Sequence, residues 1–258
     1  MRLLAIAAAC LVCSVSGVQA DDLISGTWTA GDGPAARVYV FKVSGDRITG
    51  IVCGPCNDAA SVFRIEDGRL LGNDRATFFI RHEAGGNGSR RERVEAALSR
   101  NLMTLSARPE SDAAAAAVST SLARVVANFE SNPQPLAPPP TNAGRPPARN
   151  VQGHWVSVGR RAQQNWILKV DGDQVWGLVC GPCTPDVVTM IDGFVDGDSV
   201  HFYVNHIDTP PNPERKGIQR NVMTGTITGA DNANVMRFTW VGEGTGNTGE
   251  ITMIGPVR

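Results

Sequence analysis

The sequence predicts an all-β protein made of two tandem eight-stranded antiparallel up-and-down barrels joined by a proline-rich linker. This fold class follows from an internal repeat, from short strand-like runs separated by turn residues, and from the prolines between the two copies. An up-and-down barrel is favoured because its closure leaves no strand edge exposed. A pair of immunoglobulin-like β-sandwiches is the alternative that the same pattern leaves open.

The internal repeat consists of segments that recur at a constant offset of 127 residues. A constant offset over such a length indicates one supersecondary unit that is folded twice. The last matched segment ends in Cys-Gly-Pro-Cys in both copies, and the second copy is a few residues shorter after this motif. The matched segments are 25–28 with 152–155, 41–46 with 168–173, and 50–56 with 177–183.

Strand-like runs are clearest in the second copy, where they are short and rich in Val, Ile, Thr and aromatic residues. Turn residues such as Asp171-Gly172-Asp173 separate them. In the first copy Ser119–Val126 is the expected eighth strand, and Ala113–Ala117 is compatible with a helical turn. The runs of the second copy are 154–157, 165–170, 174–180, 186–195, 199–206, 221–227, 235–242 and 249–256.

The connections between these runs alternate between short turns and longer segments. In a meander, alternate connections lie at the same end, so one end of each barrel should carry all the long loops. Loops on a rigid scaffold and the mouths of barrels are common places for ligand sites. We therefore expect any ligand at the long-loop end of each barrel.

Composition divides the chain into four parts. Residues 1–20 have the layout of a signal peptide, with Arg2, an apolar run and small residues before Ala20. The apolar run is shorter than the ~20 residues of a membrane span, which predicts export to the periplasm or the exterior and no transmembrane segment. Residues 21–128 and 150–258 are the predicted barrels, and residues 129–149 are the extended linker.

The Cys-Gly-Pro-Cys motif is also the motif of thioredoxin active sites, where it opens a helix that activates the first thiol. Here it ends a strand-like run, and the β-branched residues after it do not indicate a helix. An oxidising compartment favours disulfides within each pair, as braces of the connection between strands 3 and 4. A thiol-redox role stays open as the alternative. The cysteines concerned are Cys53, Cys56, Cys180 and Cys183.

A histidine ends the predicted fifth strand of each copy, at His82 and His206. Alternation with Phe78 and Ile80 places His82 on the inward face, at the barrel end that also carries the cysteines. Two thiolates and one imidazole suit Zn or Cu, so each Cys-Cys-His set is a metal alternative. The interpretation with fewer assumptions is a histidine that caps the core, with no cofactor.

Arginines gather on the predicted long loops. They predict an anionic ligand or an acidic partner surface, although a solvated rim is the commoner meaning of such charges. Overall charge is nearly balanced, with 24 Lys and Arg against 25 Asp and Glu, which argues against a nucleic-acid binder. The arginines are Arg90, Arg91 and Arg93 in the first copy and Arg160, Arg161, Arg215 and Arg220 in the second.

Gly-x-Trp on the first strand of each copy, at Gly26-Thr27-Trp28 and Gly153-His154-Trp155, resembles the calycin group, which includes lipocalins and avidins. The resemblance implies small-molecule binding without catalysis, and a basic residue on the last strand against the tryptophan. Arg124 and Arg258 are the candidates for that residue. We therefore predict a non-enzymatic binding protein of the periplasm or exterior. A redox or metal-binding protein and a structural envelope protein that docks a partner are the alternatives.

Overall fold

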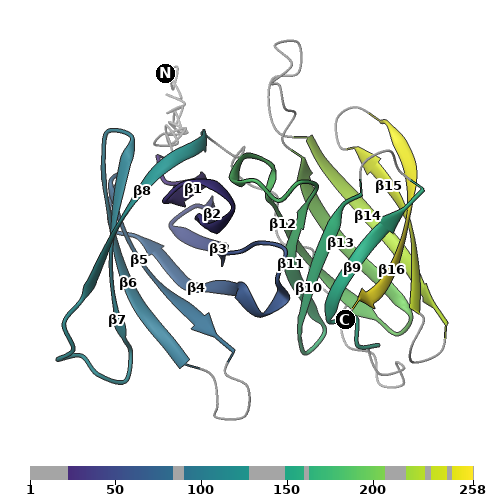
Figure 1. Cartoon of the computed structure of the whole chain (residues 1–258), viewed down its shortest axis with the longest axis horizontal. Helices are drawn as coiled ribbons and strands as arrows, with labels where there is room; N and C mark the ends of the chain where they lie inside the picture. The colour runs from purple at the N-terminus through teal and green to yellow at the C-terminus, as the bar shows by residue number, and fades with distance from the viewer. Residues whose placement is uncertain are drawn as a thin grey trace, which may run out of the picture.

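The computed structural model describes residues 23–83, 90–127, 149–159, 163–206, 219–229, 234–242 and 246–257. Within them the chain forms two closed antiparallel barrels of eight strands each, as the sequence predicts. Figure 1 shows the two barrels side by side, the first in purple to teal and the second in green to yellow. The sandwich alternative is wrong, because the first strand of each barrel pairs with both the second and the last.

The first barrel is a meander in which every strand follows its neighbour in the chain. Single turns of 3-10 helix, η1 (Gly33–Ala35) and η2 (Ala59–Ser61), lie in its long connections. The expected helical turn at 113–117 is a loop, and the eighth strand begins directly after it. The strands are β1 (Gly26–Ala30), β2 (Arg37–Ser44), β3 (Arg47–Cys53), β4 (Val62–Leu70), β5 (Arg75–His82), β6 (Arg90–Ser99), β7 (Leu102–Pro109) and β8 (Val118–Ala127).

The second barrel repeats this order. Its fourth strand begins at Thr189 rather than at Asp186, because Pro185–Val187 form a single 3-10 turn, η3, before the strand can start. The strands are β9 (Gly153–Val158), β10 (Asn165–Asp171), β11 (Gln174–Cys180), β12 (Thr189–Asp196), β13 (Ser199–His206), β14 (Gln219–Thr228), β15 (Asn234–Gly242) and β16 (Thr248–Val257).

Inward-facing side chains fill the interior of each barrel with a separate apolar core. In the first barrel the ring centroids of Phe41 and Phe78 lie 5.3 Å apart, and in the second those of Phe202 and Phe238 lie 4.9 Å apart. Such aromatic pairs add to the stability that comes from burial of apolar area. The two cores define two folding units, one for each repeat.

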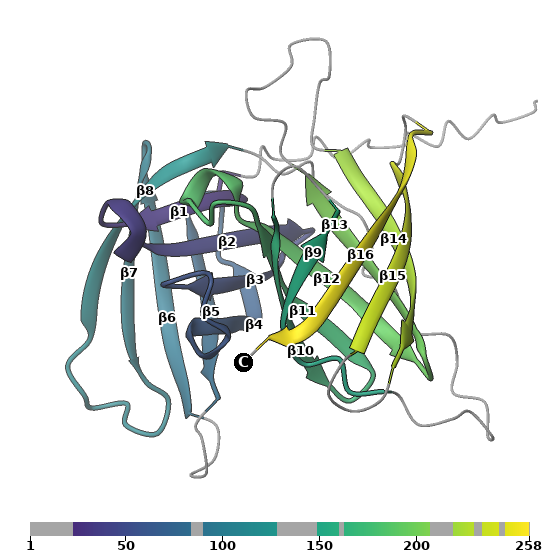
Figure 2. The same cartoon turned by 45° about the vertical axis from the view of Figure 1, so that its right-hand side comes forward.

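A third apolar cluster lies outside both barrels and joins them. It consists of outward-facing side chains of β2–β4 and β10–β12 with the adjoining cysteine motifs, and we call it the docking face. In Figure 2, β2 and β3 run across the view whereas β11 and β12 run steeply, so the two sheets pack crosswise. Its buried residues are Val38, Val40, Ile51, Cys53, Cys56, Val62, Ile167, Trp176, Leu178, Cys180, Val188 and Met190.

Equivalent residues of the two repeats meet at the docking face, as in an interface between two copies of one subunit. Ile51 and Leu178 occupy the same repeat position, as do Cys53 and Cys180. Ion pairs join the barrels beside the apolar cluster. Lys42 lies 3.8 Å from Asp192, and Lys169 lies 2.8 Å from Glu83.

Candidate functional site

The cysteine motifs form one disulfide in each repeat, Cys53–Cys56 and Cys180–Cys183. Each motif follows directly on the third strand of its barrel, at the long-loop end, and leads through a 3-10 turn into the fourth. A single 3-10 turn has too few aligned peptides to act as the helix that activates a thioredoxin thiol. The within-pair disulfides expected from the spacing are confirmed, and each one cross-links the start of the connection between strands 3 and 4.

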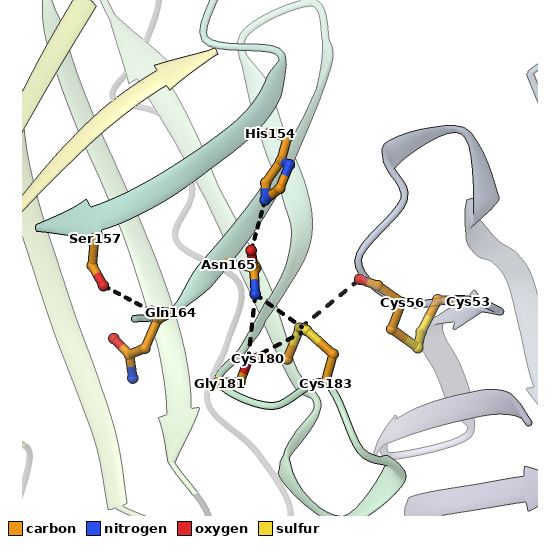
Figure 3. The surroundings of a disulfide bond; sticks show 9 residues. All are labelled: Cys53, Cys56, His154, Ser157, Gln164, Asn165, Cys180, Gly181 and Cys183. Carbon is orange, nitrogen blue, oxygen red and sulfur yellow. Dashed lines mark hydrogen bonds between the residues drawn. A yellow bond between two sulfur atoms is a disulfide. The ribbon is translucent and has the colours of Figure 1, made fainter. Parts of the chain in front are cut away.

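The sulfur atoms face the docking face rather than the barrel interiors. Cys53, Cys56 and Cys180 are 0%, 4% and 1% exposed, whereas Cys183 is half-buried. The Cys180 sulfur lies 3.9 Å from the Cys56 carbonyl oxygen, so the two motifs touch across the boundary between the barrels (Figure 3). This placement explains why both faces of the third strand are apolar in each copy: one face lines the core and the other contacts the second barrel.

The second motif has a polar support. The Asn165 side-chain amide donates to the Cys183 sulfur at 3.5 Å and to the Gly181 carbonyl at 3.3 Å, and its oxygen lies 2.9 Å from His154 Nε2. Figure 3 shows His154, Asn165 and Cys183 in line. A donor aimed at a sulfur stabilises the thiolate when the disulfide is reduced. The repeat positions of His154 and Asn165 hold Thr27 and Val38 in the first copy, so only the second disulfide has this support.

His82 lies among inward-facing side chains at the mouth of the first barrel. Its Nε2 is 3.1 Å from a Glu92 oxygen, and its ring centroid is 4.4 Å from that of Phe63. Burial alone would raise the pKa of the Glu92 carboxyl, but the hydrogen bond from Arg90 and the adjacent His82 imidazole outweigh burial and hold that pKa below its ordinary value. His206 ends β13 opposite Gln219, and its side chain lies outside the described part of the chain.

A pocket of about 360 Å³ opens at this same mouth of the first barrel. Core residues of neighbouring strands form its inner wall, and charged residues form its rim. Burial raises the pKa of the Tyr39 hydroxyl, with Arg37 opposing the rise and Glu92 adding to it. The lining includes Tyr39, Ile80, Val94, Leu105 and Ala107 on the apolar side, and Arg37, Arg90, Glu92 and Arg108 on the rim.

The mouth of the second barrel carries buried polar atoms instead. Trp166 Nε1, Asn221 Oδ1 and Trp240 Nε1 have no hydrogen-bond partner among the residues that the structure describes. Trp166 and Trp240 pack with the inward-facing core, and Asn221 begins the inward row of β14 opposite Val204. A buried polar atom without a hydrogen-bond partner destabilises the folded state. Two donors and one acceptor at one barrel end therefore suit a polar ligand that would supply the missing hydrogen bonds.

The predicted arginine rim is only partly described. Arg90, Arg91 and Arg93 lie on β6 and not on the loop before it, because cross-strand pairing with β5 begins at Arg90. Arg90 contacts Glu92 at the mouth, whereas Arg91 contacts Asp67 and Glu110 on the outer face. Arg160, Arg161, Arg215 and the side chain of Arg220 lie outside the described residues.

Metal ligation finds no support in the part of the chain that is described. No group of three or more His, Cys, Asp and Glu side chains there is placed to hold an ion. All four cysteines of the motifs are engaged in disulfides, and thiolate ligation would require them to be reduced. Among the described residues, no helix has the length and apolarity of a membrane span.

The tryptophan of the Gly-x-Trp motif is buried in both repeats. Trp28 Nε1 donates to the Ile24 carbonyl at 2.9 Å, and Trp155 Nε1 donates to the Val151 carbonyl at 2.8 Å, so both repeats fix the indole in the same way. The Arg124 guanidinium lies 4.5 Å from the Trp28 ring centroid, a cation–π contact from the last strand. Arg258, the other candidate for this contact, lies outside the described residues.

No family model matches this chain. No curated protein sequence matches it either. A solved "putative outer membrane protein" of Bacteroides fragilis aligns over 92% of this chain and 98% of its own, with 8% identity and a TM-score of 0.26. A protein of unknown function from the DUF3598 family of Nostoc punctiforme aligns over 90% and 94%, with 8% identity and a TM-score of 0.24. TM-scores this low support no conclusion about function. The two closed eight-stranded barrels are themselves compatible with a calycin-like fold.

Proposed function

We propose that this protein is an exported, non-enzymatic binding protein whose calycin-like barrels take small ligands at their long-loop ends. The observation that carries the proposal is the pocket of about 360 Å³ in the mouth of the first barrel. Its size lies within the range of small-molecule sites, about 300–1,000 Å³. Disulfides in both repeats suit an oxidising compartment, which supports export to the periplasm or the exterior.

The lining of the pocket favours an amphipathic ligand with an anionic group. Ile80, Val94 and Leu105 offer an apolar wall at depth, and Arg37 and Arg90 offer positive charge at the rim. Glu92 is bound by Arg90 and His82, which leaves Arg37 to meet an anion. An apolar body would replace water against the wall, while the head group would stay at the charged mouth.

The test uses anilinonaphthalene sulfonate, an apolar fluorophore with one sulfonate, titrated into the full chain. We expect saturable enhancement of its fluorescence at one site of the first barrel. Ala107→Trp should abolish that enhancement, because the new side chain fills the pocket, whereas Ala97→Trp on the exposed outer face of β6 should leave it intact. Equal enhancement in all three proteins would refute binding in the mouth.

Thiol-redox activity of the second disulfide is a second candidate, because Asn165 and His154 support it and Cys183 is half-buried rather than fully buried. A thiolate of an external dithiol would attack Cys183 and release the electron pair to Cys180, which takes up a proton. The second thiol of the reagent would then displace Cys183 and leave the reagent as a cyclic disulfide.

This candidate is tested with graded dithiothreitol and iodoacetamide labelling followed by mass spectrometry. Labelling of Cys180 and Cys183 should precede that of Cys53 and Cys56, since both first-copy sulfurs are buried. Asn165→Val introduces the residue of the first copy, and it should raise the dithiothreitol concentration at which the Cys180–Cys183 disulfide is reduced. Simultaneous reduction of both pairs, unaffected by Asn165→Val, would eliminate a specialised redox site.

A further inference from the structure

Four arginines stand on the outer face of β3, β4 and β5, away from the mouth of the barrel. Arg47 lies directly opposite Arg69, and Arg64 lies directly opposite Arg81. Like charges at directly opposed positions of a sheet destabilise it. In each pair one arginine has a carboxylate partner, Asp46 for Arg69 and Glu66 for Arg81.

The second repeat shows that the barrel does not require these arginines. Its registers place Gln174 and Phe194 where the first repeat has Arg47 and Arg69. Met190 stands in the position of Arg64, since Leu178 pairs with Met190 as Ile51 pairs with Arg64. The cationic cluster is therefore particular to the first copy.

A one-residue insertion accompanies the arginines. Ile65 and Gly68 have the repeat positions of Ile191 and Gly193, so β4 contains two residues, Glu66 and Asp67, where β12 has only one. The β3–β4 and β4–β5 registers both shift at this point, whereas the corresponding registers of the second barrel are continuous. The extra residue thus forms a β-bulge, a feature that often re-aims side chains beside functional sites.

An outer hollow of about 580 Å³ lies at the bulge. We call it the arginine hollow; its lining comprises Arg47, Ile48, Thr49, Arg64, Ile65, Glu66, Asp67, Gly68 and Arg69. It lies on the outside of the first barrel and is separate from the mouth pocket, with which it shares no lining residue.

The acidic groups of the hollow are already bound by other arginines. Glu66 lies 3.3 Å from Arg81. Asp67 lies 2.6 Å from Arg91. Arg69, which itself lines the hollow, lies 3.3 Å from the exposed Asp46. Arg47 and Arg64 have no carboxylate within salt-bridge distance in the described ranges of the chain.

Arg64 is also held in place from the second barrel. Its guanidinium carbon lies 5.8 Å from the Trp176 ring centroid, and Trp176 is buried in the docking face. The docking of the barrels therefore positions one wall of the hollow. A positioned guanidinium loses less freedom when it binds than an arginine that is free in solvent.

We propose that the arginine hollow binds a phosphate group. Three guanidinium groups and the Thr49 hydroxyl around one hollow suit a phosphate, whose several oxygens accept hydrogen bonds from more than one side, whereas one guanidinium fork satisfies a carboxylate. The phosphate belongs to a soluble phosphate ester or to a phospholipid headgroup. This site does not depend on the mouth pocket.

The experiment measures pyrophosphate binding to the full chain by titration calorimetry at low salt. We expect binding that weakens steeply as salt is added. The double variant Arg47→Gln/Arg64→Met, which carries the second-copy residues, should weaken it about tenfold or more, because each arginine contributes a charge-assisted hydrogen bond. Arg93→Gln is the matched control, since Arg93 is an exposed arginine on β6 outside the hollow.

A second variant deletes Asp67 and restores the register of the second repeat. Binding should be lost while the melting temperature shows that both barrels are folded. A parallel arm measures sedimentation with phosphatidylcholine vesicles that contain phosphatidic acid, and binding that the double variant abolishes there identifies the lipid headgroup as the source. Pyrophosphate and vesicle binding that are both absent would overturn the proposal, as would equal weakening in Arg93→Gln.

Discussion

Ile167→Ala tests the docking of the two barrels most directly. Ile167 and Leu168 are neighbours on β10, and both are 0% exposed. Leu168 belongs to the core of the second barrel, whereas Ile167 points out of that barrel into the docking face. Truncation of a buried Leu or Ile to Ala costs about 2–5 kcal/mol. If the barrels dock as described, Ile167→Ala should fall in this range and approach the cost of Leu168→Ala.

The assay is urea unfolding of the full chain, followed by tryptophan fluorescence, which reports on the second barrel through the buried Trp155 and Trp166. Val158→Ala is the control, because Val158 is 39% exposed on the outside of the same barrel. Substitutions at such surface positions change stability by about 0.5 kcal/mol or less. If Ile167→Ala behaves like Val158→Ala, the outer face of β10 is solvated and the docking face does not exist in solution.

Three further substitutions test features of the individual barrels. Gly153→Ala should destabilise the second barrel in thermal melts, because Gly153 has φ +140° and a Cβ there would lie 2.6 Å from Pro256 Cβ; wild-type stability would contradict this backbone geometry. Arg124→Met should lower stability by about 0.5–2 kcal/mol through loss of the cation–π contact with Trp28, and an unchanged urea midpoint would argue against that contact. Glu92→Gln should flatten the acid limb of the stability–pH curve. The folded-state pKa of Glu92 lies below its ordinary value, so its contribution is present above the unfolded pKa and is lost as pH falls through the folded pKa. An acid limb identical to wild type would contradict this role.

The sequence predicts the barrels well because alternation, turn residues and duplication all describe local structure. The constant offset of 127 residues identifies the repeat, and connection lengths place the cysteine motifs at the long-loop end. The same local signals do not reveal the docking face. Both faces of the third strand are apolar in each copy. Only the packing of the two barrels against each other, through Ile51 on one side and Leu178 on the other, shows which face lies in the docking face and which lines the core.

The arginine hollow could not be predicted from the sequence either, although the sequence contains a signal for it. The second copy is shorter after the motif, and part of that difference is Asp67, which creates the bulge. A length difference does not say where in a strand the extra residue falls, because only the pairing register locates it. The partners of Cys183 were missed for a similar reason: Asn165 and His154 lie on strands that pair beside the motif, far from it in the sequence.

The docking face joins two repeats that are separate segments of one chain. In a homodimer, every substitution appears on both sides of the contact at once, and so a change that suits one side must also suit the other. Here Lys42 has an aspartate partner within β12, while Lys169, at the same repeat position, has a glutamate partner that follows β5. Covalent continuity keeps the partner present at any dilution. The two barrels can therefore diverge in sequence independently. A barrel that carries an arginine cluster can stay docked to a second barrel that has no such cluster.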